Sequence, residues 1–161
     1  MRDTPFELTF EIDRAISGRP LARLEKALNA VQLVRGRTVL LSIEAHGSDC
    51  VSAAHDSIDV LRSAGVQPLR LVEDLVTRSE IARRSGVTPQ AVGLWGRGER
   101  HADRVWPEPY HLLGTELWLW SEVLDVLPGL GIELDDLPGP SRLEIQIIGG
   151  ALANSVVSAA V

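Results

Sequence analysis

The chain has 161 residues, of which 45% are hydrophobic and 24% are charged, with a formal net charge of −6 and a mean hydropathy of +0.07. This composition predicts a globular protein with a core, and no apolar run reaches the roughly 18 residues of a membrane span. The single cysteine, Cys50, excludes an internal disulfide, and no Cys/His cluster has zinc-ligand spacing. We therefore expect a cytoplasmic protein with no metal, no cofactor and no membrane partner.

The first 73 residues alternate between strand and helix patterns. Residues 6–12 are apolar at every second position, which predicts a half-buried strand. The elements expected next are a helix from about Leu21 to Val31, strands at 32–34 and 38–45, a helix from Ser48-Asp49 to Ala64-Gly65, and a strand at 66–72. This order predicts a ferredoxin-like α+β domain. The fold hosts many functions, so we assign the domain to dimerisation or sensing, with any effector unknown.

Residues 77–98 predict two short helices joined by a tight glycine turn. Thr77 and Glu80 form a capping box that begins the first helix at about Arg78. Gly86 supplies the left-handed residue that ends it. This spacing indicates a helix-turn-helix.

The second helix of this motif is expected from Pro89 to Arg97, after an N-cap at Thr88. Val92 and Trp95, at i and i+3, are expected to face the first helix. The residues expected to point outward are Gln90, Gly93, Leu94 and Arg97. These outward residues are the candidate readers of a DNA groove.

Arginines concentrate on the motif. Between Thr77 and Arg104 the chain has six arginines and three acidic residues, a formal charge of +3 in a chain of −6. Such a segment is typical of a phosphate-binding surface. The candidate phosphate contacts are Arg78, Arg83, Arg84, Arg100, His101 and Arg104. A purely structural helical hairpin would reproduce the caps and the apolar spacing, but it would not require this charge.

A small β-wing is expected after the second helix. Two prolines keep residues 106–109 extended. Residues 110–112 and 116–118 are then expected to pair across a turn formed by Leu113, Gly114 and Thr115. Ser121 is expected to cap a further helix over residues 122–127, and the predicted core of this region includes Trp118 and Trp120.

The tail, residues 128–161, predicts an acidic connector and an apolar helix that starts at Ser141. The positions expected near one helical face are Leu143, Ile147, Ile148, Leu152, Val156 and Ala159. Gly149-Gly150 weakens this helix but permits the close approach of another backbone. The sequence leaves open whether the tail packs on its own domain or contacts a second copy of the chain.

Three segments, in this order along the chain, resemble the winged helix-turn-helix regulators of the MerR-like and AlpA-type excisionase group. They are residues 75–92, Trp106-Pro-Glu-Pro and Leu117-Trp-Leu-Trp-Ser-Glu-Val. The resemblance covers about Leu75 to Leu127 and implies a bacterial or phage protein that binds double-stranded DNA. It implies that the second helix enters the major groove and that the wing touches the flanking backbone or minor groove. Glu116 stands where these proteins often have an arginine.

Carried over by position, the resemblance implies that Thr88, Gln90 and Arg97 face the DNA, with the wing tip at Gly114 and Thr115. Chemistry favours Gln90 as the base reader, because a glutamine amide pairs bidentately with adenine. Arg97 or Arg100 is expected to read guanine or to hold a phosphate.

We interpret the chain as a sequence-specific DNA-binding protein of the nucleoid, most simply a transcriptional regulator, with domains at 1–73, 74–127 and 128–161. The short second helix predicts a homodimer on a repeated half-site. No nucleophile, base and orienting group can be assembled, so we expect no catalytic residues and no enzyme. The alternatives are an antitoxin-like protein-interaction module and an architectural excisionase-type recombination factor.

Overall fold

The computed structural model describes residues 3–101, 103–111 and 114–159, apart from the side chains of residues 156 and 159. It divides into two compact units: the first comprises Met1–Glu73 and Leu137–Val161, and the second comprises Asp74–Asp136. The described ranges contain six α-helices and belong to the α+β class, as the sequence predicts. The predicted third segment, 128–161, is divided between the two units.

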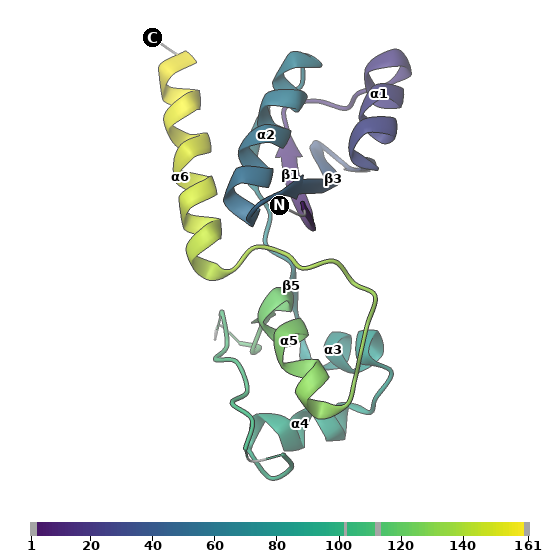
Figure 1. The fold of residues 1–161 in the computed structure, drawn as a ribbon, viewed down its shortest axis with the longest axis vertical. Helices are drawn as coiled ribbons and strands as arrows, with labels where there is room; N and C mark the ends of the chain where they lie inside the picture. The colour runs from purple at the N-terminus through teal and green to yellow at the C-terminus, as the bar shows by residue number, and fades with distance from the viewer. Residues whose placement is uncertain (1–2, 102, 112–113, 160–161) are drawn as a thin grey trace. The chain divides into compact units, whose positions relative to one another are not determined.

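The first unit is a four-stranded antiparallel sheet with three helices (Figure 1). Its strands are β1 (Thr4–Ile12), β2 (Val31–Arg35), β3 (Thr38–Gly47) and β4 (Pro68–Leu71). Its helices are α1 (Gly18–Leu28), α2 (Cys50–Ser63) and α6 (Arg142–Ala159). The strands lie in the order β2-β3-β1-β4, and every neighbouring pair is antiparallel. All six elements predicted for residues 1–73 are present, with shifted ends.

The core of the first unit follows from the alternation along β1. Leu8, Phe10 and Ile12 are buried on one face of the sheet, while the residues between them lie on the other face and are less buried. Asp49 caps α2 by accepting from the Ser52 N–H at 2.8 Å. Cys50, the first residue of α2, is buried, and burial raises the pKa of its thiol to about 12.

The residues predicted to share one apolar face of the C-terminal helix do not all lie on the same side. The residues of α6 that pack inward, against α2 and β4, are Ile145, Ile148 and Leu152. Leu143 and Ile147, expected on the same face, are instead 65% and 45% exposed. The periodicity failed here because apolar residues surround most of this helix, so spacing alone does not define which side is covered. The side chains of Val156 and Ala159 lie outside the described set.

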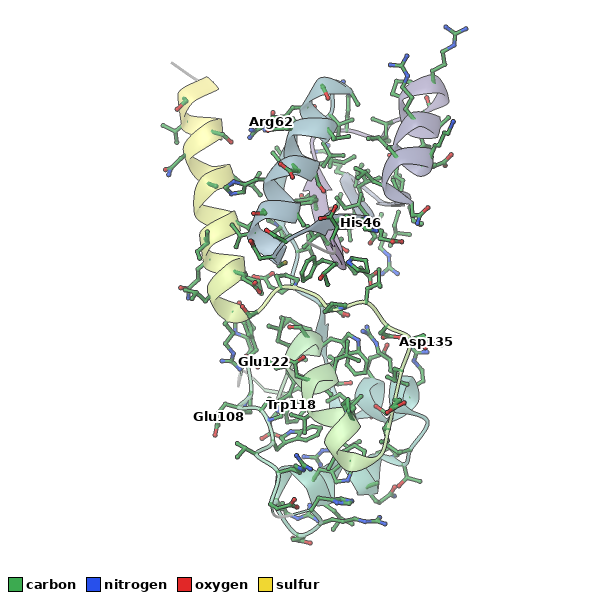
Figure 2. The ribbon with its side chains drawn as sticks, in the orientation of Figure 1. His46, Arg62, Glu108, Trp118, Glu122 and Asp135 are labelled. Atoms are coloured by element: carbon green, nitrogen blue, oxygen red, sulfur yellow. The ribbon has the colours of Figure 1, made fainter. Side chains whose placement is uncertain are left out.

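Polar contacts attach α6 to the rest of the first unit. Ser141 begins the helix as an N-cap, and its Oγ and the Glu144 carboxylate form a capping box. Nη2 of Arg62, on α2, donates to Ser155 Oγ at 2.6 Å (Figure 2). The inward face of α6 is therefore fixed on its own domain.

The second unit contains the two short helices predicted for residues 77–98 and a two-stranded sheet. Its elements are β5 (Leu75–Val76), α3 (Arg78–Ser85), α4 (Pro89–Gly96), β6 (Trp118–Leu119), α5 (Trp120–Val126) and a 3₁₀ helix, η1 (Leu127–Leu130). The expected cap at Ser121 is wrong, because α5 already begins at Trp120. Pairing of β6 with β5 brings the chain directly into this helix, and the Trp120 N–H donates to the Asp74 carbonyl at 2.8 Å.

Aromatic side chains close the core of the second unit. Trp118, labelled in Figure 2, and Trp120 are buried, as predicted. Trp118 Nε1 donates to the Pro107 carbonyl at 3.2 Å. The other buried members of this core are Val76, Ile81, Ala82, Val92, Trp95, Val123 and Leu127. Among the described residues, no helix is both long enough and apolar enough to span a bilayer.

Candidate nucleic-acid interface

The two helices of the motif begin and end as their caps predict. Thr77 Oγ1 accepts from the Glu80 N–H at 3.2 Å and begins α3, but the Glu80 carboxylate accepts from Arg83 and Arg84 and so does not supply the second half of the predicted capping box among the described contacts. Gly86 follows α3 with a φ of +68°, the left-handed conformation that glycine adopts without steric cost. Thr88 Oγ1 accepts from the Ala91 N–H at 3.2 Å and begins α4. The predicted helix-turn geometry is therefore confirmed at the level of its hydrogen bonds.

One side of α4 packs inward and the other carries the expected reader. Val92 and Trp95 are buried in the core, as predicted. Thr88 and Gln90 are exposed at the start of the helix, and Leu94 is partly buried. Within the described part of the chain, the Gln90 amide makes no hydrogen bond, so both its donor and its acceptor are available.

Gly93 is buried, although the sequence predicts that it points outward. Two guanidinium groups lie over it: a Cβ on Gly93 would be 3.4 Å from Arg97 Nη1 and 3.8 Å from Arg78 Nη1. The absent side chain therefore leaves room for both arginines to converge, one from the first residue of α3 and one from the residue after α4. A predicted base reader, Arg97, and a predicted phosphate contact, Arg78, are brought together here.

The two arginines border a pocket of about 270 Å³ between α4 and residues 106–109. Its wall includes Trp106, whose ring centroid lies 5.7 Å from that of Trp95 and 6.4 Å from that of Trp118. The Trp106 Nε1 atom is buried and has no hydrogen-bond partner among the described residues. The pocket thus combines an aromatic wall with two cationic groups at its edge.

Both converging arginines carry an acidic partner that the sequence reasoning missed. Arg78 Nη2 lies 3.3 Å from Glu116, and Arg97 Nε donates to Glu99 at 2.6 Å. The hydrogen bond from Arg97 lowers the pKa of Glu99, and Glu99 raises the pKa of Arg97, so this pair stays ionised at neutral pH. Proximity in sequence to Arg97 could have indicated Glu99, whereas no local signal connects Glu116 with Arg78.

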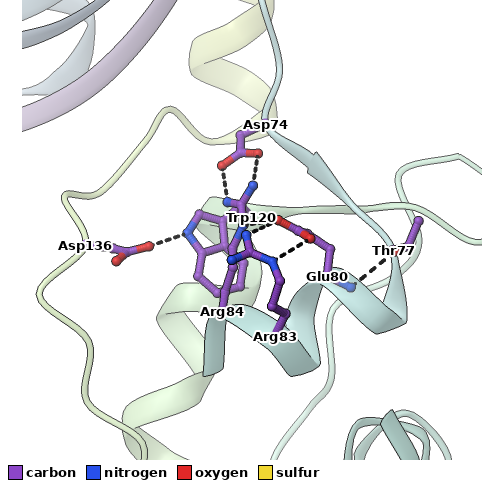
Figure 3. Close-up of polar contacts among 7 residues, drawn as sticks. All are labelled: Asp74, Thr77, Glu80, Arg83, Arg84, Trp120 and Asp136. Carbon is purple, nitrogen blue, oxygen red and sulfur yellow. Dashed lines mark hydrogen bonds and ion pairs between the residues drawn. The ribbon is translucent and has the colours of Figure 1, made fainter. Parts of the chain in front are cut away.

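Arg84 belongs to a different, more buried cluster (Figure 3). Its guanidinium donates to Asp74 at 2.5 and 2.9 Å and to Glu80 at 3.1 Å, and it lies 4.9 Å from the ring of Trp120. Arg83 donates twice to the same Glu80 but remains largely exposed. Hydrogen bonds from Arg83 and then Arg84 lower the pKa of Glu80 to about 2. Arg84, predicted as a phosphate contact, is therefore occupied by partners of its own unit.

The remaining predicted phosphate contacts lie beyond α4. Arg100 and His101 are exposed and make no side-chain hydrogen bond or ion pair within the described residues, and His101 has a left-handed φ of +55°. Arg104 lies 3.5 Å from Asp103, and its guanidinium packs over Gly129 of η1. The six predicted phosphate contacts therefore lie in different local environments and do not form one continuous face.

Among the described residues, the predicted wing is represented by a single bridge. His111 and Leu117 form an isolated antiparallel bridge, and the Tyr110 N–H donates to the Leu117 carbonyl at 2.6 Å. Trp118, expected in the second wing strand, belongs to β6 instead and pairs with β5. Of the expected turn, Gly114 and Thr115 are exposed, with a φ of +76° at Gly114, whereas residues 112–113 lie outside the described residues.

Comparisons with known proteins add no assignment to this geometry. No protein-family model, no curated protein and no solved structure matches the chain. Across residues 3–101, 103–111 and 114–159, no group of three or more His, Cys, Asp or Glu side chains is placed to hold a metal ion.

Proposed function

We propose that this chain is a sequence-specific DNA-binding protein, a transcriptional regulator, whose helix α4 enters the major groove. One observation carries the proposal: a capped, exposed helix presents an unengaged Gln90 amide, and beside it Arg78 and Arg97 converge over the buried Gly93. A major groove admits an α-helix, and a glutamine amide can pair bidentately with adenine there. The neighbouring guanidiniums provide the cationic contacts that hold a helix against the phosphates.

The ion pairs of the two arginines are compatible with this role. Glu116 and Glu99 are about half-exposed, as are the arginines they contact. An ion pair in such surroundings contributes little free energy, because water and salt screen it. A DNA phosphate therefore replaces each carboxylate at small cost, and both arginines move from an internal acid to the DNA backbone.

The second unit is a winged helix-turn-helix, supported by its cap geometry and by the bridge of His111 with Leu117. The first unit is a ferredoxin-like domain, supported by the strand order β2-β3-β1-β4. Arg84 is not included among the proposed phosphate contacts, because its guanidinium already binds Asp74 and packs on Trp120. The proposed phosphate contacts are then Arg78, Arg83, Arg100, His101 and Arg104, together with Arg97.

Selection of bound sequences from random duplex DNA tests the proposal. The full chain is expected to enrich a motif at low salt, and Gln90→Ala is expected to lose the preference at one position, with binding otherwise retained. Glu133→Gln, at an exposed position outside the two helices, serves as a control and should enrich the wild-type motif. The proposal is overturned if the wild-type chain enriches no motif, or if Gln90→Ala enriches the wild-type motif unchanged.

A further inference from the structure

Helix α6 has a second apolar face that its own domain leaves uncovered. Ile145, Ile148 and Leu152 face inward, but Leu143, Ile147 and Val157 are 65%, 45% and 66% exposed. Exposed apolar residues scattered singly are ordinary on a protein surface, whereas several along one helix mark a contact surface. This outward face therefore fits a partner outside its own domain.

The spacing of the outward face indicates the kind of partner. The exposed positions Leu143, Ile147, Gly150, Asn154 and Val157 follow one another in steps of four, three, four and three residues. Steps that alternate between three and four place side chains in a straight seam along a helix, the pattern that packs against another helix. The partner that fits this face is therefore a helix laid along it.

The glycines of α6 point to close packing from outside. A Cβ on Gly149 or Gly150 would meet no atom within 4 Å, so the packing of this chain does not require glycine at either position. Glycine in a helix interior is unfavourable relative to alanine, and it permits another backbone to approach closely. Gly150 lies at the middle of the exposed seam, where two crossing helices would be nearest to each other.

We propose that the partner is a second copy of this chain, bound through antiparallel packing of the two α6 helices. A two-fold axis at Gly150 places Leu143 against Val157 of the second copy and Ile147 beside its Asn154. No charged residue occurs between Ile145 and Val161, so two copies meet without like-charge repulsion although each chain carries −6. The seam is thus complementary to itself.

The role of this dimer in binding DNA rests on the proposed function. The eight residues of α4 read only a short stretch of a groove, and two copies would read a repeated half-site. The pairing itself is measured on the protein without DNA. A monomeric chain that still enriches a motif would overturn the dimer alone, and a dimer that enriches none would overturn the DNA-binding proposal alone.

Sedimentation equilibrium of the full chain tests the pairing. Wild type is expected to be a dimer, and Ile147→Glu is expected to raise its dissociation constant by at least about 100-fold, because the seam would bury an unpaired charge. Val31→Glu, at an exposed apolar residue of the edge strand β2, is the matched control and should remain dimeric. A monomeric wild type, or dissociation by Val31→Glu and not by Ile147→Glu, overturns the proposal.

Two further variants separate pairing from folding and define its direction. An added Cβ at Gly150, an exposed position, would meet no described atom within 4 Å, so Gly150→Leu should weaken the dimer while the thermal stability of the monomer is retained. A mixture of Leu143→Cys and Val157→Cys chains should form mixed disulfides on oxidation, because antiparallel packing brings these two positions together. Cys50 does not compete, because it is buried. Dimerisation that tolerates Gly150→Leu, or disulfides only between identical chains, contradicts antiparallel packing at Gly150.

Discussion

Arg84 and Arg97 lie in the same helix pair and both donate to carboxylates, but their surroundings differ. The Arg84 side chain is 25% exposed, held by Asp74 and Glu80 and stacked on Trp120. The Arg97 side chain is 56% exposed and meets only Glu99 within hydrogen-bond distance among the described residues. The first arginine stabilises the unit, and the second can exchange its carboxylate for a phosphate. A count of arginines along α3 and α4 therefore overstates the charge that is available to the proposed DNA partner.

The largest loss of stability is expected from a substitution at Trp120, where the Arg84 cluster meets the core. Trp120→Ala should lower the free energy of unfolding of the second unit by about 3–5 kcal/mol, because it removes a buried ring. It also removes the indole that donates to Asp136 at 3.0 Å. All four tryptophans lie in this unit, so their fluorescence during urea unfolding monitors it selectively. Val105→Ala, at an exposed apolar residue, should unfold as wild type does; an equal loss there would contradict the core assignment.

A smaller loss of stability should distinguish the neighbouring arginines of α3. Arg84→Ala is expected to cost about 1–2 kcal/mol of unfolding free energy, since it removes the stacking on Trp120 together with partly buried ion pairs. Arg83→Ala should cost less than Arg84→Ala, because its pair with Glu80 is more exposed and is screened by water. Urea unfolding of both variants gives the comparison, and equal losses would mean that burial does not separate their roles.

Removing an acidic partner should increase DNA binding at the exposed cluster. Glu116→Gln frees Arg78 and is expected to raise affinity for the selected duplex about threefold at low salt, with a smaller gain at high salt. Glu11→Gln removes the nearer acidic partner of Arg70 in the first unit and leaves Glu73 at 4.0 Å; as the matched control it should bind as wild type does. Titration by fluorescence anisotropy measures both, and an affinity that Glu116→Gln leaves unchanged would show that Arg78 does not approach the DNA.

The smallest effect is a pH dependence centred on Glu80. Its pKa is lowered from 4.5 to about 2 in the folded unit, so its ion pairs stabilise the fold above pH 4.5. That contribution is lost as the pH falls from 4.5 towards 2, where the folded state also takes up the proton. Glu80→Gln should therefore flatten the decline in stability between about pH 5 and pH 3, as measured by urea unfolding. A decline as steep as that of wild type would contradict the low pKa.

Local signals predicted much of this molecule. Thr77, Gly86 and Thr88 were identified from sequence because caps act within three residues, and the structure confirms each of them. The alternation along β1 and the cap at Asp49 gave the strand and helix order of the first unit for the same reason.

Features that depend on distant partners escaped prediction. The start of α5 depends on the pairing of β6 with β5, more than 40 residues away, so Ser121 was assigned wrongly as its cap. The pairing of Arg78 with Glu116 also joins residues that are far apart in the sequence, so no local pattern predicts it. Gly93 offered a partial signal, because a glycine inside a helix usually has a packing reason, but the two guanidiniums above it come from separate segments.

Salt dependence of DNA binding tests the central claim most directly. The slope of log K against log salt concentration should become shallower by about 0.9 for each phosphate that a variant no longer neutralises. Arg78→Ala and Arg97→Ala should each show such a change. Arg70→Ala in the first unit, where an equally exposed arginine pairs with Glu11 at 2.7 Å, should keep the wild-type slope. Equal slopes for all four proteins would contradict an interface at Arg78 and Arg97.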